Sequence, residues 1–141
     1  MANDNGFEPL AGGCLCGDIR YQINEKPIDA GYCHCRLCQR SSGAPVLAWV
    51  SINVAGVEFA KTEPESYRSS EHGMRLFCRR CGTQIAFKQV DKPSSIDINI
   101  GSLDEPSKVT PDYHIWMQSR IPWFDIADDL PRYDDGGPDA R

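Results

Sequence analysis

The chain has 141 residues, of which 40% are hydrophobic and 25% charged, and it carries a formal net charge of −5 with a pI near 5.1. A chain of this length is expected to form one domain with a core of its own. The acidic balance argues against a phosphate backbone as the main partner, and no apolar run approaches the roughly 20 residues that cross a bilayer. Neither nucleic acid nor a membrane is therefore expected as a partner.

The predicted elements are short apolar segments separated by turn residues, a pattern that indicates a mainly β fold. A strand is expected over residues 19–23, where apolar and polar side chains alternate. A short helix is expected over residues 36–42, because Gly43 and Pro45 stop it there. A longer apolar run predicts a central strand over residues 46–52. Further strands are expected over residues 57–60, 66–69, 74–77, 84–88, 96–100 and 113–117.

The strand over residues 96–100 shows the clearest alternation in the chain. Its isoleucines are expected to face the core, with Asp97 and Asn99 pointing outward. Aromatic packing completes the predicted core, with tryptophans at positions Trp49, Trp116 and Trp123.

The ends of the chain differ in composition from its middle. Residues 1–9 are interpreted as an N-terminal arm, residues 10–125 as the domain, and residues 126–141 as an acidic tail. The tail is rich in Asp, Gly and Pro, so it is predicted to be largely disordered. The N-terminus has neither a basic start nor the apolar stretch of a secretory signal, and a cytoplasmic location is expected.

Seven cysteines in three tight clusters are the main functional signal. An odd number cannot pair completely within one chain, and a cytoplasmic location also disfavours a disulfide framework. Metal is therefore the favoured interpretation. Iron or an iron–sulfur cluster remains an alternative, although separated C-x-C and C-x-x-C pairs are typical of zinc knuckles. The cysteines are Cys14, Cys16, Cys33, Cys35, Cys38, Cys78 and Cys81.

Spacing suggests how these cysteines divide between two ions. Three lie within six residues at Cys33, Cys35 and Cys38, where a strand end and a helical turn can bring them around one centre. The pair Cys78 and Cys81 flanks a tight turn, and the pair at positions 14 and 16 can complete a four-thiolate site. Mixed pairings remain an alternative. Four thiolates close a structural site, whereas three leave a coordination position open.

Histidines and arginines close to the cysteines allow more than one interpretation. His34 could close the three-cysteine site, although alternation in an extended segment points it away. His114 is either a packed side chain or an acid or base in a pocket. The neighbouring arginines are expected on the solvated surface, or else they receive substrate carboxylates. These are Arg36, Arg40, Arg79 and Arg80.

Five segments of the chain resemble the signatures of one known family. They are Gly13-Cys14-Leu15-Cys16-Gly17, Cys33-His34-Cys35-Arg36-Leu37-Cys38-Gln39-Arg40 with Ser42-Gly43-Ala44-Pro45, Phe77-Cys78-Arg79-Arg80-Cys81-Gly82-Thr83, His114-Ile115-Trp116 and Pro122-Trp123. The family is that of the glutathione-dependent formaldehyde-activating enzyme and centromere protein V, and the resemblance spans about residues 10–125. It implies a single-domain Mss4-like β-fold with at most short helical turns. It also implies two zinc ions per chain, a structural one on Cys14, Cys16, Cys78 and Cys81 and a catalytic one on Cys33, Cys35 and Cys38.

An open three-thiolate zinc suits the chemistry of thiols better than that of water. Three anionic sulfurs leave the site at a formal charge of −1, so it is a weaker Lewis acid than zinc held by histidines. A thiol in the open position could instead become a nucleophile and add to an aldehyde. The resemblance likewise implies a carbon–sulfur lyase acting on a glutathione-like thiol and a small aldehyde such as formaldehyde. The alternative is a non-catalytic zinc-binding structural or interaction module. The sequence indicates neither a catalytic residue beyond the zinc ligands nor an oligomeric state.

Overall fold

The structure is a computed structural model that describes residues 6–139. Within this range it contains ten strands in two sheets and one α-helix, so the predicted mainly β, single-domain fold is confirmed. Residues 1–5 of the predicted N-terminal arm and residues 140–141 of the predicted tail lie outside the described residues.

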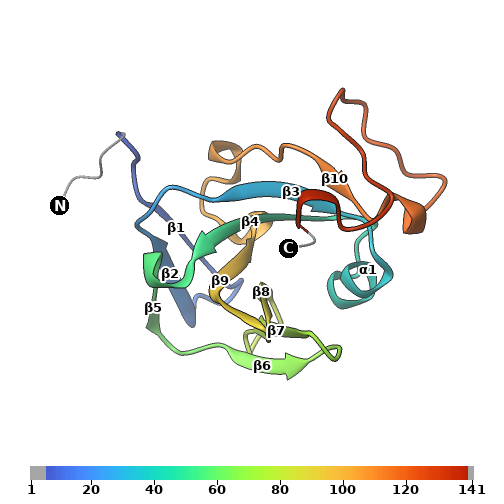
Figure 1. The fold of residues 1–141 in the computed structure, drawn as a ribbon. Coiled ribbons are helices and arrows are strands. Elements are labelled where there is room, and N and C mark those ends of the chain that lie inside the picture. Colours follow the sequence, from blue (N-terminus) through green and yellow to red (C-terminus); the bar gives the residue numbers. More distant parts are fainter. Residues whose placement is uncertain (1–5, 140–141) are drawn as a thin grey trace.

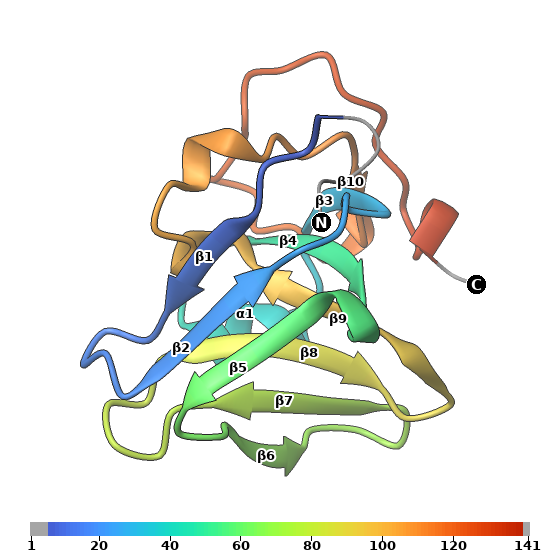
Figure 2. The same cartoon turned by 90° about the vertical axis from the view of Figure 1, so that its left-hand side faces the viewer.

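The two sheets lie across one another as layers (Figures 1 and 2). The small sheet has the order β1-β2-β5 and the large one the order β10-β3-β4-β9-β8-β7-β6. Neighbouring strands are antiparallel except for β10 and β3, which are parallel. The small sheet consists of β1 (Leu10–Gly13), β2 (Ile19–Ile23) and β5 (Val57–Lys61). The large sheet consists of β3 (Asp29–Cys33), β4 (Leu47–Asn53), β6 (Glu65–Arg68), β7 (Gly73–Phe77), β8 (Gln84–Gln89), β9 (Lys92–Asn99) and β10 (His114–Ile115).

The central strands of the large sheet bury both of their faces. In β4, Val50 belongs to the main core between the sheets, whereas Trp49 belongs to a second cluster with Cys33 and Cys38. In β9, the isoleucines join the main core as predicted. The outward, solvated position predicted for Asp97 and Asn99 is wrong, because they are only 9% and 7% exposed. Alternation places them on the second face, which is itself covered.

The helix α1 (Arg36–Ser42) begins and ends as the sequence predicts. At its start, the Cys35 sulfur accepts a hydrogen bond from the backbone N–H of Cys38 at 3.3 Å. At its end, Gly43 adopts the left-handed conformation with a φ of 72°, and its N–H donates to the carbonyl of Gln39. Two strands, β1 and β3, were not predicted, because each is short and contains glycine.

The segment after residue 125 is attached to the edge strand β10, where it runs alongside in Figure 1. The backbone N–H of His114 donates to the carbonyl of Pro131 and that of Tyr133 donates back to His114, both at 2.9 Å. The N–H of Trp116 donates to the carbonyl of Asp135. The sequence predicts a largely disordered tail, and in the structure residues 131–135 make these backbone hydrogen bonds along β10. Its composition offers little apolar anchorage, but the edge of the sheet provides backbone partners instead.

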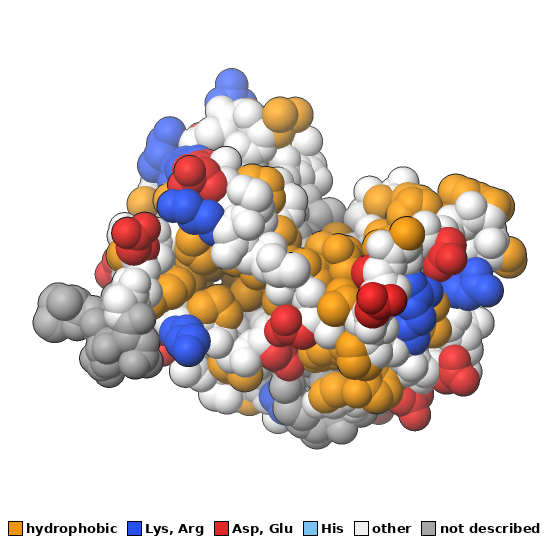
Figure 3. All heavy atoms as spheres, turned by 90° about the horizontal axis from the view of Figure 1, so that it is seen from above, with side chains coloured by type: hydrophobic (Ala, Val, Ile, Leu, Met, Phe, Trp, Pro, Cys, Tyr) orange, Lys and Arg blue, Asp and Glu red, His pale blue; other side chains and the backbone are white. Residues whose placement is uncertain are grey.

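The surface carries charges of both signs. On the face shown in Figure 3, basic side chains are scattered among acidic ones and around hydrophobic patches. Among residues 6–139, no helix has the length and apolar character needed to span a membrane.

Candidate metal centres

The first cysteine cluster joins the two sheets. Cys14 and Cys16 lie in the turn between β1 and β2, and Cys78 and Cys81 lie in the turn between β7 and β8. Figure 2 shows both turns on the same side of the molecule. The four sulfur atoms lie within 4.8 Å of one another, so segments more than sixty residues apart meet at one point.

The two turns share a local geometry that directs backbone N–H groups at sulfur. The N–H of Ile19 donates to Cys14 Sγ at 3.2 Å, and the N–H of Cys81 donates to Cys78 Sγ at 3.4 Å. Gly17 and Gly82 each adopt a positive φ, 82° and 79°, which tightens the chain after the last cysteine of the pair. Such donors stabilise the thiolate form of cysteine, which is the form that binds metal.

The sulfur spacing in this cluster fits a tetrahedral ion. Cys16 Sγ lies 3.6 Å from Cys14 Sγ and 3.8 Å from Cys78 Sγ. Four sulfurs held at about 2.3 Å from a tetrahedral zinc are about 3.8 Å apart, whereas a disulfide requires about 2.05 Å. Thr83 supports the same cluster, since its hydroxyl hydrogen-bonds to Cys81 Sγ and lowers the pKa of that thiol to about 5.

The second cluster lies on the opposite face of the large sheet, between β3 and α1. Cys33 ends β3, Cys35 caps the helix, and Cys38 lies in its first turn. Their sulfur atoms also lie within 4.8 Å of one another, and those of Cys33 and Cys38 are 3.3 Å apart. Among the described residues, no further His, Cys, Asp or Glu joins this group. The set can hold a metal ion while leaving a coordination position for another ligand.

Ionisation of one thiol in this cluster opposes ionisation of the others. Hydrogen bonds with Cys33 and Cys38 lower the pKa of Cys35 to about 2. The hydrogen bond with Cys33 lowers the pKa of Cys38, but that with Cys35 and burial raise it, leaving it at about 11. The first thiolate to form is thus stabilised by its neighbours, which then resist losing their own protons. A divalent cation would remove this conflict.

A cavity of about 410 Å³ opens onto the second cluster, a volume typical of small-molecule sites. All three cysteines contribute to its wall. Its apolar lining includes Trp49, Ile115 and Trp116, and its buried polar lining includes Asp97 and Asn99. A ligand in this cavity therefore meets the sulfur cluster on one side and a small number of polar groups on the other.

Arg75 is the buried cation of this cavity. Its guanidinium donates from Nη2 to Cys38 Sγ at 3.7 Å and from Nε to the Ser69 hydroxyl at 3.2 Å, and it lies 4.9 Å from the centre of the Phe87 ring. The residue is only 5% exposed. Sequence reasoning missed it, because an arginine that alternates with Met74 and Leu76 in a strand is expected to point to solvent.

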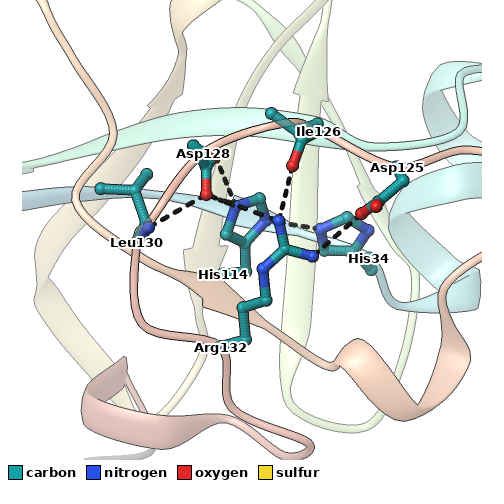
Figure 4. Close-up of polar contacts among 7 residues, drawn as sticks. All are labelled: His34, His114, Asp125, Ile126, Asp128, Leu130 and Arg132. Atoms are coloured by element: carbon teal, nitrogen blue, oxygen red, sulfur yellow. Dashed lines mark hydrogen bonds and ion pairs between the residues drawn. The ribbon is translucent and has the colours of Figure 1, made fainter.

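His34 points away from the sulfur cluster and toward the C-terminal tail. Its Nε2 lies 2.9 Å from Nδ1 of His114, whose Nε2 lies 2.9 Å from the Asp128 carboxylate (Figure 4). Burial lowers the pKa of His34 to about 4, and the hydrogen bond with His114 lowers the pKa of Asp128. Arg132 holds the same carboxylate and also pairs with Asp125. His114 is thus a packed residue that connects the tail to the loop that carries Cys33 and Cys35.

The other residues weighed from the sequence lie mostly at the surface. Arg36 is exposed at the rim of the cavity, and Arg79 is exposed and lies 3.8 Å from Glu65. The core position predicted for Trp123 is wrong, because this side chain is 75% exposed. Trp49 is buried as predicted, but it and Trp116 also form the cavity wall.

Comparisons with known proteins identify the family and support the fold. A family model described as "Glutathione-dependent formaldehyde-activating enzyme" matches residues 9–119. A Schizosaccharomyces pombe protein described as an uncharacterized lyase is 26% identical over 116 residues, which are 82% of this chain and 84% of the relative. The crystal structure of a Rhodobacter sphaeroides protein matches with a TM-score of 0.55 at 21% identity, covering 67% of this chain and 87% of that one. This last match supports the fold alone.

Proposed function

Because the chain belongs to the glutathione-dependent formaldehyde-activating enzyme family, we propose that it is a zinc-dependent carbon–sulfur lyase. It reversibly adds a glutathione-like thiol to a small aldehyde. The observation that carries this proposal is the cluster of Cys33, Cys35 and Cys38 in the wall of a cavity of about 410 Å³. The name of the S. pombe relative, a lyase, supports the same reaction class.

Two zinc ions per chain are part of the proposal. The sulfurs of Cys14, Cys16, Cys78 and Cys81 would hold a structural ion, and those of Cys33, Cys35 and Cys38 a catalytic one. Soft thiolate ligands favour zinc over calcium or magnesium, which prefer oxygen ligands. When bound at the three-cysteine cluster, zinc would supply a soft cation that stabilises a substrate thiol as its thiolate.

The residues of the cavity bind and orient the two substrates. The apolar side chains of Trp49, Ile115 and Trp116 exclude water from the aldehyde carbon, where water competes with the thiol. In the forward direction the thiol loses its proton and a carbon–sulfur bond forms at the carbonyl carbon. The carbonyl oxygen receives the π electrons and a proton, giving a hemithioacetal. The reverse reaction breaks the same carbon–sulfur bond and returns aldehyde and thiol.

The test measures how fast glutathione and formaldehyde interconvert with their hemithioacetal. Proton exchange spectroscopy gives this rate. The wild-type protein should accelerate interconversion, whereas Cys35→Ser should act no faster than buffer, because it removes a sulfur from the open cluster. Arg40→Ala is a matched control, since this exposed residue of α1 does not line the cavity. It should retain the wild-type rate.

Metal content separates the lyase from a zinc-braced module without turnover. Wild-type protein should contain about two zinc ions per chain and Cys35→Ser about one, with the fold intact. Equal exchange rates for the wild type and Cys35→Ser, at those metal contents, would favour the structural module and contradict the lyase.

A further inference from the structure

Arg75 is the only Lys or Arg that is buried among residues 6–139. An unpaired guanidinium in an apolar site is costly, so a buried arginine is normally explained by the anion that it faces. Its described contacts are a neutral hydroxyl, an aromatic ring and the sulfur of Cys38. The sulfur cluster is therefore the anionic partner that these contacts identify.

Arg75 is also positioned to contact a molecule that binds at the three-cysteine cluster. Arg75 lines both the main cavity and a neighbouring one of about 500 Å³ beside α1. The Ser69 hydroxyl and the Phe87 ring hold its side chain, so little entropy is lost when the guanidinium meets a ligand. The exposed Arg36 lines only the main cavity and the exposed Arg40 only the neighbouring one, and solvent screens the charges of both.

The balance of charge in the cavity shows why a cation is needed there. Three thiolates with a divalent ion have a formal charge of −1. A substrate thiolate that joins them makes the formal charge of the site −2. The buried Asp97 lies in the same cavity, two strands away from Arg75 in the register Arg75↔Phe87↔Asp97. Without a cation, a further anion would enter a site that already repels it.

We propose that Arg75 is the residue that makes the open coordination position selective for an anionic sulfur ligand. Its charge offsets the second negative charge when a thiolate binds beside Cys38, whereas a neutral ligand gains nothing from it. This inference rests on the proposed function in one respect, that a thiol occupies the open position. It assigns Arg75 a positioning role.

The test measures the affinities of two small probes for zinc-loaded protein by calorimetry. 2-Mercaptoethanol binds as an anion, and imidazole binds as a neutral ligand. Arg75→Gln should weaken the binding of 2-mercaptoethanol by on the order of tenfold to a hundredfold and change imidazole binding by less than about threefold. Arg75→Lys, which keeps the charge on a shorter side chain, should fall between wild type and Arg75→Gln.

Arg75→Lys also tests the inference by itself, in case Arg75→Gln does not fold or does not retain two zinc ions. Its loss of affinity should be confined to 2-mercaptoethanol and leave imidazole binding unchanged. The inference is overturned if Arg75→Gln weakens both probes equally or neither, or if Arg75→Lys weakens imidazole as much as the thiol. If 2-mercaptoethanol binding depends on Arg75 but the wild type does not accelerate hemithioacetal exchange, the proposed lyase function is contradicted. The proposed role of Arg75 in binding is then still supported.

Discussion

The two cysteine clusters differ in where their ligands come from and in what surrounds them. The four-cysteine cluster takes two ligands from each of two turns that belong to different sheets. The three-cysteine cluster takes all of its ligands from one stretch of six residues, and a cavity opens onto it. Ligands from distant segments make a cluster part of the fold, whereas ligands from one segment can lose their ion with less effect on the rest.

The largest expected difference is between Cys81→Ser and Cys35→Ser. A structural zinc contributes on the order of 10 kcal/mol to folding, which is comparable to the whole stability of a small domain. Cys81→Ser removes part of that contribution and separates the two sheets, so it should be unfolded or insoluble at pH 7. Cys35→Ser should stay folded with a cooperative thermal transition. Circular dichroism with zinc analysis checks both, and a folded Cys81→Ser beside an unfolded Cys35→Ser would reverse the assignment.

Metal removal should distinguish the two cysteine clusters without any mutation. The four-cysteine cluster has one more thiolate, and its ligands come from turns of both sheets. Titration with a chelator should therefore release about one zinc ion per chain with little change in the far-ultraviolet circular dichroism. The second ion should leave only as the β signal is lost. An indicator dye measures the released zinc, and a single phase in which both ions leave with the fold would contradict the distinction.

His34 gives the three-cysteine region a pH dependence of its own. Its pKa of about 4 in the folded chain lies below the unfolded value of about 6.5. The neutral form is therefore favoured by folding, and this contribution is fully present above pH 6.5. It is lost as the pH falls toward 4, by about 3 kcal/mol. Urea unfolding between pH 6.5 and 4 should show this decline in the wild type.

His34→Gln is the control for this pH effect, because glutamine can still hydrogen-bond to His114 but does not titrate. Its stability should fall less over the same pH range, with zinc content measured at each pH to account for protonation of the ligands. Parallel declines in the wild type and His34→Gln would show that the cysteines, and not His34, cause the acid sensitivity.

The features that sequence predicted and those it missed have a common physical explanation. The end of the helix over residues 36–42 was predicted correctly, because a glycine just past its end and a nearby proline are local signals. The sulfur groups followed from short spacings in the chain. By contrast, Arg75 and Asp97 occupy polar positions of alternating strands, which usually face solvent. Only the second layer over this face, formed by α1 and the segments around Trp116, turns them into cavity residues.

The contacts of the tail could not be predicted from its composition, for a related reason. Composition reports how much apolar surface a segment can bury, and by that measure residues 126–139 have little. The structure holds them through backbone hydrogen bonds to β10 and through the Asp128 carboxylate on His114. Both interactions depend on the edge of β10 being available as a partner, which composition does not reveal.

The smallest expected effect comes from matched glycine substitutions in the two regions. Gly82 in the four-cysteine turn and Gly43 at the end of α1 have φ values of 79° and 72°, and a methyl group at either position meets no other atom within 4 Å. Alanine should therefore cost about 1 kcal/mol of backbone strain at each site. Because the steric cost is the same at both sites, thermal unfolding at saturating zinc should show similar losses of stability in Gly82→Ala and Gly43→Ala. At limiting zinc, Gly82→Ala should lose more stability than Gly43→Ala, since its turn holds a ligand of the ion that joins the two sheets. Equal losses at both zinc concentrations would mean that the turn tolerates the change without moving Cys81.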